Sequence, residues 1–315
     1  MLPLADLKAL NVYDLHVHIG PEVVPRRYSA ATLAEELAAV EMGAVVKNHF
    51  VPTTYLVSGA AAGPATGPVV SPETLTPSVT LNVFTGGIHV DALRNAVSGM
   101  KADTQQRDPD KARLMVWMPT LSAKAHLDYY GRDLDPAWGV SAEYSMRREA
   151  ARALTVLAED GSLTQECRRV LQAVAAHDYV LGTGHLSRQE IFAVVNGAVE
   201  AGVRRIVVTH AWFPANGLDL EDQVRLSRLP GVYIEHCWFV SLVDHIPMER
   251  YVESIRAVGP AKTVLSTDGG QMVSDPIPTA WRRFIGDLQR LGVELDDIRR
   301  MASENPRRLL FGDPE

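Results

Sequence analysis

The chain has 315 residues, long enough for two ordinary domains or one large single-core architecture and too long for a small disulfide-held scaffold. Apolar residues make up 46% and charged residues 22%, a composition that excludes an intrinsically disordered chain. Lys and Arg number 31 against 38 Asp and Glu, and the resulting net charge of −7 argues against nucleic acid as a partner.

Three further features of the sequence bear on location. The first ten residues include Asp6 and Lys8 and lack the apolar run of an export signal. The longest uncharged stretch, residues 51–72, is interrupted by prolines and glycines, so we expect a loop there and no membrane helix. Cys167 and Cys237 are too few for a disulfide framework and are expected in the core. A cytoplasmic protein is predicted.

Short β-rich runs alternate with amphipathic segments along the chain. The predicted strands are Val12–Ile19, Ala44–Phe50, Val79–Gly86, Leu114–Pro119, Val180–His185, Arg205–His210, Val232–Cys237 and Thr263–Asp268. The predicted helices include Ala31–Met42, Met146–Ala158, Gln165–His177, Arg188–Ala201, Leu220–Leu229 and Met248–Val258.

Eight strand–helix units predict an α/β fold, a single (β/α)8 TIM barrel in one domain spanning residues 1–315. Long loops are expected after the second strand (residues 51–77) and the fourth (121–145), on the face where such barrels bind substrates. Near the end, Asn305 is a candidate N-cap, with Pro306 at the first helical position. The alternative is an open, doubly wound sheet. Its nucleotide-binding form has little support, because Gly20-Pro21 follows the first strand in place of a glycine-rich loop.

Histidines mark the end of the first predicted strand. Alternation predicts that His16 and His18 point to the same side, together with Asp14. The opposite face is apolar and carries Tyr13, Leu15, Val17 and Ile19. Residues two apart on a strand are separated by about 6 to 7 Å, close enough for both rings to reach one metal ion.

Three more candidate metal ligands end other predicted strands. His185 ends the fifth predicted strand, His210 the sixth and Asp268 the eighth. A parallel barrel brings these strand ends to one rim, where imidazole and carboxylate groups would form a metal site.

In these features the sequence resembles the amidohydrolase superfamily of metal-dependent barrels, over the whole chain. The resemblance rests on His16-x-His18, on His185, His210 and Asp268, and on the terminal Asn305-Pro306 helix. It implies that His16, His18 and Asp268 bind a divalent metal, with His185 as a further ligand. It leaves His210 either a ligand or an acid–base group.

The sequence departs from the two-metal pattern of that superfamily. The fourth predicted strand, Leu114–Pro119, has no Lys or Glu that could bridge two ions. The second strand offers Lys47, on the same face as His49, as a replacement. Lys47 would have to be deprotonated, carboxylated, or turned toward an anionic group of the substrate, because an ammonium group beside a dication is disfavoured. One ion or two is left open.

A metal with an open position can produce hydroxide at neutral pH, so the predicted reaction is hydrolysis of an amide, cyclic amide or ester in a small organic molecule. Asp268 would carry the proton, and His210 or His236 would stabilise the developing oxyanion. At the end of the seventh strand, alternation lets only one of Glu235 and His236 face the ion, and His236 is preferred. The further candidates for substrate contact are His49, Trp212 and Tyr129.

The same residues allow other interpretations. Decarboxylases of the same superfamily use a similar ligand set, and a non-catalytic ligand-binding barrel could use the ion only for structure. Zinc is the first expectation for the metal, and manganese, iron or nickel also suit these ligands. Many barrels of this kind form homo-oligomers, but the sequence does not indicate the oligomeric state.

Overall fold

The computed structural model describes residues 4–61, 74–101, 113–131 and 153–312. Its strands are β1 Tyr13–His18, β2 Gly43–Lys47, β3 Leu75–Thr76, β4 Ser78–Thr80, β5 Met115–Trp117, β6 Val180–Gly182, β7 Ile206–Val208, β8 Val232–Cys237 and β9 Thr263–Ser266. Each of the eight predicted runs overlaps one of these strands, and the third run overlaps β4. All the strand pairs are parallel.

One helix precedes the first strand, and the others lie between the strands or after the last one. The α-helices are α1 Leu4–Leu10, α2 Ala30–Ala38, α3 Thr53–Ala61, α4 Val90–Lys101, α5 Lys124–Tyr130, α6 Gln165–Ala176, α7 Arg188–Glu200, α8 Leu220–Ser227, α9 Trp238–Val243, α10 Met248–Val258, α11 Ile277–Arg290, α12 Leu295–Arg299 and α13 Asn305–Phe311. Short 3-10 turns are η1 Val83–Thr85, η5 Pro214–Asn216 and η6 Pro260–Lys262, and η7 Arg300–Glu304 is a π-helical segment.

The strands form two parallel sheets, in the orders β1-β2-β3 and β4-β5-β6-β7-β8-β9. At one junction, Pro77 separates β3 from β4, and the Ser78 hydroxyl donates to the carbonyl of Val46 on β2 at 2.7 Å. At the other, Val17 of β1 forms a parallel bridge with Gly269, just beyond β9. The two sheets are therefore joined by these contacts and not by a continuous ladder of backbone pairs.

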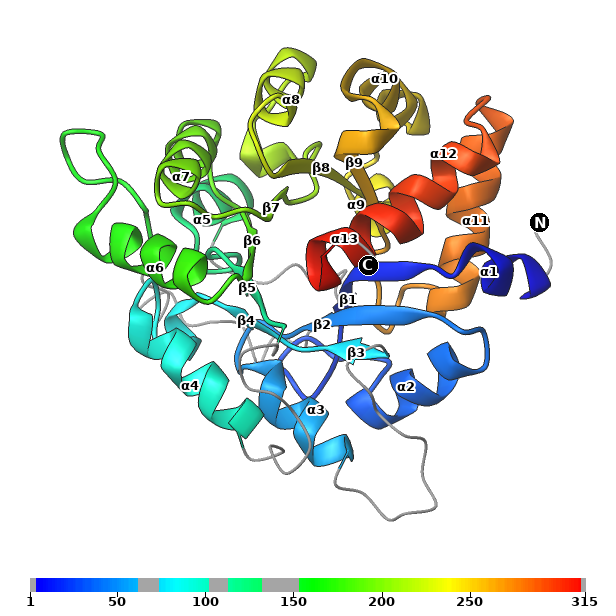
Figure 1. The fold of residues 1–315 in the computed structure, drawn as a ribbon, viewed down its shortest axis with the longest axis horizontal. Helices are drawn as coiled ribbons and strands as arrows, with labels where there is room; N and C mark the ends of the chain where they lie inside the picture. Colours follow the sequence, from blue (N-terminus) through cyan, green and yellow to red (C-terminus); the bar gives the residue numbers. More distant parts are fainter. Residues whose placement is uncertain (1–3, 62–73, 102–112, 132–152, 313–315) are drawn as a thin grey trace.

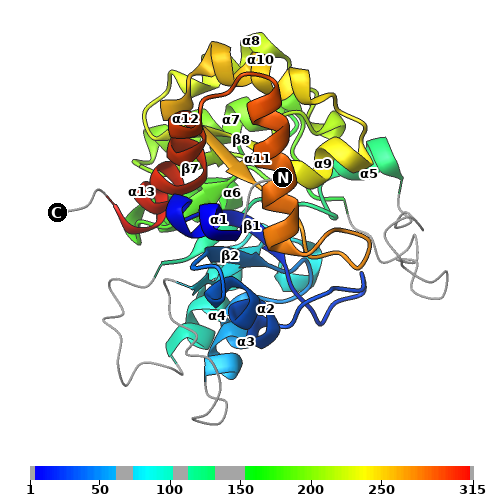
Figure 2. The same cartoon turned by 90° about the vertical axis from the view of Figure 1, so that its right-hand side faces the viewer.

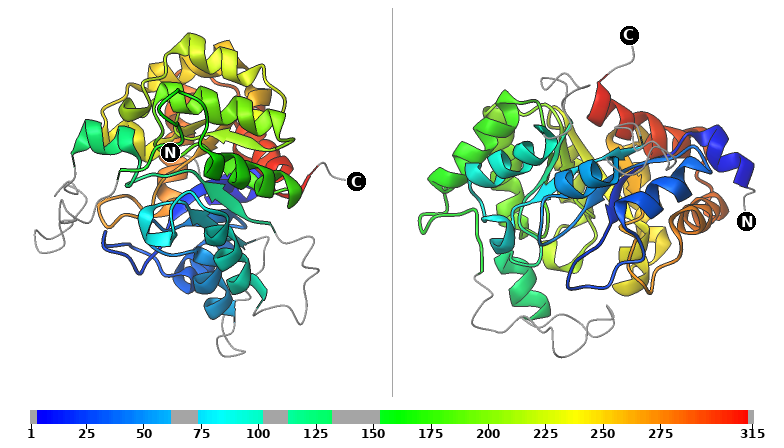
Figure 3. Two further views of the ribbon diagram at one scale, coloured as in Figure 1. Left: turned by 90° about the vertical axis from the view of Figure 1, so that its left-hand side faces the viewer. Right: turned by 90° about the horizontal axis from the view of Figure 1, so that it is seen from below.

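The helices lie outside the strands (Figure 1). Helices α2, α3 and α4 cover β1 to β4 on one side, and α7 to α11 cover the later strands on the opposite side (Figure 2). Two further views show the same central strands enclosed by helices (Figure 3). No helix within the described residues has both the length and the apolar character required to cross a membrane.

An apolar cluster fills the space between the strands, and most of the strands contribute side chains to it. Its buried members are Tyr13, Leu15, Val45, Met115, Trp117, Val180, Val207, Tyr233, Val264, Leu309 and Leu310. The last two residues belong to α13, so the C-terminal helix covers one end of this cluster. The same end carries the contact between Tyr13 and Phe311, whose ring centroids are 5.5 Å apart.

Four sequence predictions about elements are wrong. Residues 124–130, expected in the long loop after the fourth strand, form α5. Residues 53–61, expected in a loop, form α3, where Tyr55 donates a hydrogen bond to Asn95 of α4 at 2.8 Å. The predicted helix Met146–Ala158 extends beyond the described residues, and its described end is not helical, since Leu154 bridges Ala123 in extended conformation. Asn305 does not act as an N-cap.

Asn305 instead lies inside a continuous helical segment, with helical backbone on both sides. Its side-chain amide donates to the carbonyls of Pro260 and Thr263 at 2.8 and 2.7 Å. This asparagine therefore ties α13 to the start of β9.

Candidate metal centre and pocket

A register irregularity in β1 decides which residues face the interior. The pairing of β1 with β2 shifts between Asp14 and Val17. Tyr13 and Leu15 belong to the interior cluster, yet Val17 packs with the helices outside. The prediction of one uninterrupted alternation is therefore wrong, because the local irregularity changes the face on which later residues lie.

Asp14 is separated from the histidines by this irregularity. Its carboxylate accepts hydrogen bonds from the Thr267 hydroxyl at 2.6 Å and from the Trp281 indole at 2.9 Å. Burial, the largest influence, raises the pKa of Asp14 to about 6. Asp14 thus links β1 to the end of β9 and to α11 and does not face the pocket.

His16, His18 and Asp268 meet at one point. The Oδ1 atom of Asp268 lies 3.1 Å from Nε2 of His16 and 3.0 Å from Nε2 of His18. Both imidazoles are buried, and the Asp268 side chain is 13% exposed. These atoms form one of the groups whose mutual distances permit a shared metal ion.

Glu235 of β8 fixes the other side of the His16 ring. Its Oε2 atom lies 3.3 Å from Nδ1 of His16 and accepts a hydrogen bond from the backbone N–H of His210 at 3.0 Å. Burial by itself raises the pKa of Glu235, but the neighbouring His16 and His210 outweigh this effect. The pKa of Glu235 is therefore lowered, to about 2. An ionised Glu235 accepts a hydrogen bond from the N–H of His16 at Nδ1, which leaves Nε2 of His16 unprotonated as the ligand atom.

Lys47 also reaches His16. Its Nζ atom lies 2.8 Å from Nε2 of His16 and 4.6 Å from the centre of the Trp117 ring. Burial lowers the pKa of Lys47 to about 8, although Asp268 and Glu235 oppose that shift. The amine therefore loses its proton more easily than an ordinary lysine and lies deep in the site.

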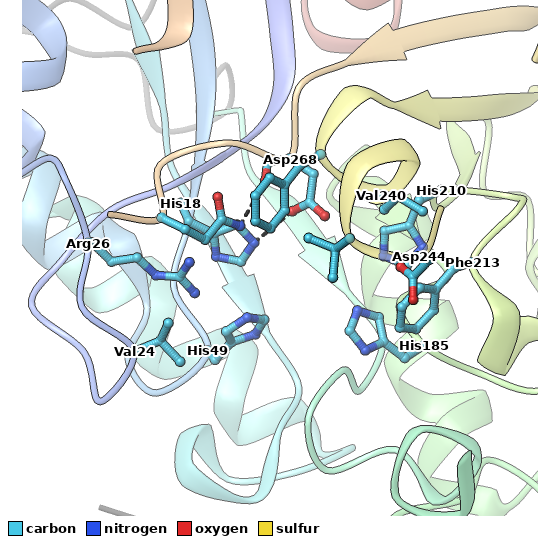
Figure 4. A pocket seen from close by; sticks show the side chains of 13 residues that line it. His18, Val24, Arg26, His49, His185, His210, Phe213, Val240, Asp244 and Asp268 are labelled. Carbon is cyan, nitrogen blue, oxygen red and sulfur yellow. Dashed lines mark hydrogen bonds and ion pairs between the residues drawn. The ribbon is translucent and has the colours of Figure 1, made fainter. Parts of the chain in front are cut away.

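A pocket opens beside these residues and has a cavity volume of about 60 Å³. One wall carries His18, Arg26 and His49, and the facing wall carries His185 and His210 (Figure 4). The remaining lining residues are Val24, Phe213, Phe239, Val240, Val243, Asp244, Asp268 and Gln271.

His185 and His210 follow the ends of β6 and β7, and their ring centroids are 4.9 Å apart. The strand ends are aligned because the backbone N–H of Thr209 donates to the Thr183 hydroxyl, and that of Gly184 to the Thr209 hydroxyl, each at 3.0 Å. Nδ1 of His185 lies 2.9 Å from Nδ1 of His126 on α5.

Burial dominates the ionisation of the pocket imidazoles. It lowers the pKa of His18, His49, His185 and His210 well below the ordinary value. These rings are therefore neutral at neutral pH and keep the lone pairs that a metal or a substrate proton requires. Burial likewise raises the pKa of Asp268.

Backbone conformation gives a second indication of a functional site. His210 and Asp268 have positive φ angles of 28° and 51°. Non-glycine residues rarely adopt this conformation outside turns, and it is enriched where a side chain is held for function.

The residues predicted to contact substrate fall in different places. His49 lines the pocket, where its Nδ1 lies 2.9 Å from the Thr120 hydroxyl. The indole of Trp212 points away and donates to the carbonyl of Arg250 at 3.1 Å. Its neighbour Phe213 lines the pocket instead. Tyr129 is 60% exposed and lies against Tyr130.

His236 does not face the pocket. Its ring stacks on Tyr251 of α10 at a centroid distance of 4.9 Å, on the outer side of β8. The preference for His236 over Glu235 is therefore wrong. Alternation allowed one of the two to face inward, but it did not specify which one.

Sequence reasoning missed Glu22, Arg26, Asp244 and Gln271 around the pocket. Glu22 and Arg26 lie in the segment between β1 and α2, so their position after a strand end was the available signal. Asp244 accepts a hydrogen bond from the Tyr130 hydroxyl at 2.5 Å, which joins α9 to α5. Nothing in the local pattern indicated that contact.

The donor atoms present suit a divalent metal. Two imidazole nitrogens and a carboxylate oxygen converge, the combination used in mononuclear metal hydrolases. Among the described residues, Nδ1 of His18 and Nδ1 of His210 are buried without a hydrogen-bond partner. Both of these histidines also line the pocket.

Comparison with solved structures identifies the class of fold. A proposed 2-pyrone-4,6-dicarboxylic acid hydrolase from Pseudomonas putida has a TM-score of 0.52 at 14% identity, covering 97% of this chain and 99% of the other. An amidohydrolase from Pseudomonas aeruginosa has a TM-score of 0.51 at 10% identity, covering 98% and 99%. The predicted resemblance to amidohydrolases is confirmed at the level of the fold.

Residues 11–235 match the model of a family of unknown function, DUF6282, and the chain belongs to that family. No curated protein matches the sequence. The matched span includes His16, His18, His185 and His210 and ends at Glu235.

Proposed function

We propose that this protein is a metal-dependent hydrolase of small organic molecules. The observation that carries the proposal is the meeting of His16 Nε2 and His18 Nε2 on Asp268 Oδ1, at 3.1 and 3.0 Å. His185 is a further candidate ligand, and His210 is either a ligand or a group that acts on the substrate. Lys47 lies close enough to His16 to join the ligand set, carboxylated or as the free amine. Zinc is the metal we expect first, as one ion or two.

The two sheets fit a single (β/α)8 barrel, with β3 and β4 together as its third strand. Two observations support this arrangement: the order of the strands, and the contacts that join Val17 to Gly269 and Ser78 to Val46. In such a barrel, the residues that follow the strands share one rim. We accordingly assign residues 1–315 to one domain.

The protein groups have separate tasks in the proposed reaction. A bound divalent metal supplies Lewis acidity, which makes water a nucleophile at neutral pH and polarises a carbonyl oxygen. Asp268 takes the water proton and passes it to the leaving group, a task suited to a carboxyl whose pKa is raised by burial. Glu235 holds the His16 ring in the tautomer with Nε2 unprotonated.

His210 and the apolar wall act on the substrate. The neutral His210 ring lies in the pocket and can donate a hydrogen bond to the developing oxyanion. Phe213, Phe239 and Val240 exclude water from the other side. The bond cleaved belongs to an amide, cyclic amide or ester.

Metal content tests the site directly. His16→Ala and His18→Ala each remove one converging nitrogen, and we expect bound divalent metal after dialysis to fall at least about tenfold, since each ligand is a large part of the affinity. Elemental analysis of the purified proteins measures this. His177→Ala, at an exposed histidine beyond α6, is the matched control and should retain the wild-type content.

Unchanged metal in His16→Ala and His18→Ala would refute the site. If the protein binds metal, analysis of the products formed from small amides, lactones and carboxylated aromatics distinguishes the two reactions. Water uptake indicates hydrolysis, and release of carbon dioxide indicates a decarboxylase. Unfolding on metal removal, without any turnover, would indicate a structural ion in a ligand-binding protein.

A further inference from the structure

Arg26 lines the pocket, forms a buried ion pair with Glu22 and takes no part in the reaction proposed above. Arg26 and Glu22 form a charge-assisted pair through the Nε and Nη2 atoms of the arginine. Their side chains are 3% and 0% exposed. A buried guanidinium at a pocket wall has lost most of its water, so the N–H groups that Glu22 leaves unused gain from a ligand that accepts hydrogen bonds.

The guanidinium is held in place before any ligand arrives. The backbone of Arg26 forms an antiparallel bridge with Gln271, and the N–H of Arg27 donates to the carbonyl of Gly270 at 2.8 Å. Oε2 of Glu22 accepts a hydrogen bond from the backbone of His49 at 2.8 Å. Little conformational freedom therefore remains to be lost on binding, which favours affinity.

Part of the donor set of Arg26 stays available. The guanidinium carries five N–H groups on three nitrogens, and Glu22 engages two of those nitrogens. Within the described parts of the chain, no residue accepts a hydrogen bond from Nη1. Figure 4 shows the end of this side chain directed toward the space between His18 and His49.

The surrounding charges select the anion. Glu22 already balances most of the charge of Arg26, and Asp244 and Asp268 line the same pocket. These carboxylates would repel a dianionic phosphate, but the remaining donors suit one planar, singly charged group. Lys47 is a weaker candidate anchor, because its amine is directed at His16 and Trp117 and does not line the pocket.

We propose that Arg26 binds a carboxylate group of the substrate, so that the enzyme acts on small carboxylic acids. The catalytic part of this statement rests on the proposed hydrolase function, but the binding part does not. With the carboxylate beside Arg26 and His49, the reacting bond lies toward His18 and Asp268 in the same small cavity. Apolar contacts with Phe213 and Val240 would hold the rest of the molecule.

Ligand titration with a matched pair of probes tests the proposal. Butyrate and butyramide have nearly the same shape and differ in charge. We expect the wild-type protein to bind butyrate about tenfold to a hundredfold more tightly, the range for a charge-assisted hydrogen bond, as measured by NMR titration. Arg26→Gln should reduce this preference to within about twofold.

Two variants keep the test independent of folding. Glu22→Gln/Arg26→Gln removes both buried charges together, so no unpaired charge remains to destabilise the protein, and it should lose the same preference. Arg94→Gln removes a charge from an arginine on α4 that is 76% exposed, and it should behave as wild type. Thermal melts confirm the folded state of each variant.

Equal binding of the two probes by the wild-type protein, or an unchanged preference in the folded double variant, would overturn the carboxylate site. The metal content of the same samples separates this failure from failure of the hydrolase. A protein that binds metal and hydrolyses neutral amides but does not prefer butyrate refutes only the role of Arg26. A protein that prefers butyrate but binds no metal refutes only the hydrolase.

Discussion

The imidazole of His236 is buried against Tyr251, and neither of its ring nitrogens has a hydrogen-bond partner among the described residues. Burial lowers the pKa of His236 to about 3, with Glu235 opposing the shift. As the pH falls, His236 of the unfolded chain is therefore protonated near pH 6.5, whereas His236 of the folded protein is protonated only near pH 3. The contribution of His236 to stability is complete above pH 6.5 and is lost as the pH falls toward 3.

We expect His236→Phe to weaken the acid sensitivity of the fold. The replacement keeps an aromatic ring on Tyr251 and removes the group that must be protonated. Between pH 6.5 and 4.5, the wild-type free energy of unfolding should fall by about 2 to 3 kcal/mol more than that of the variant. Urea denaturation at a series of pH values measures the difference.

A surface histidine with the same type of neighbour is the control. His177 stacks on Tyr179 at a centroid distance of 5.3 Å and is exposed. His177→Phe should leave the pH dependence as in wild type. Identical acid curves for wild type and His236→Phe would mean that the buried ring is not neutral in the folded protein.

At the scale of elements, the turn after β9 holds the first strand in position. The backbone N–H of His18 donates to the carbonyl of Gly269 at 2.8 Å, which brings β1 against this turn. Gly270 has a φ of +106°, and a Cβ atom there would lie 2.1 Å from the carbonyl oxygen of His18. The close approach that positions His18 beside Asp268 therefore requires glycine.

Gly270→Ala should destabilise the protein by at least about 2 kcal/mol and lower its metal content, because the backbone of His18 must move. Gly259→Ala is the matched control: its φ is +89°, and nothing lies within 4 Å of the added carbon. Thermal or chemical denaturation of both variants measures their stability. The difference between them separates the steric clash with His18 from the strain of the positive φ angle. Equal losses in the two would show that the approach to His18 is not constrained.

At the scale of the whole molecule, the helix that covers the apolar cluster and the candidate metal ligands lie at opposite ends of the strands. The C-terminal helix α13 covers the apolar cluster with Leu309 and Leu310, which are 1% and 0% exposed. The candidate ligands lie at or just beyond the other ends of the strands.

Leu310→Ala should reduce the free energy of unfolding by about 2 to 5 kcal/mol, the usual cost of a cavity in a packed core, without changing metal content at a temperature where the protein is folded. Leu295→Ala, on the neighbouring α12 and 38% exposed, is the control, with an expected change within about 0.5 kcal/mol. Loss of metal from folded Leu310→Ala would show that the two ends are coupled.

Several features could be predicted from the sequence alone. The alternation of β-rich and amphipathic runs predicted the order of parallel strands, because that pattern is local and repeated. The positions of His16, His18, His185, His210 and Asp268 at or near the carboxyl ends of strands predicted that they would converge, since parallel strands bring these ends together. The resemblance to amidohydrolases followed from the same five residues and the terminal Asn305-Pro306 helix.

Only the tertiary structure decided which side chains enter the site. The irregularity in β1 directs Asp14 toward Trp281, and the orientation of β8 selects Glu235 over His236. Arg26 reaches the pocket because its segment pairs with Gln271, more than 240 positions later in the chain. A periodic sequence pattern predicts alternation but does not show where an irregularity shifts it to the other face. Pairing between distant segments cannot be predicted from the residues next to either segment.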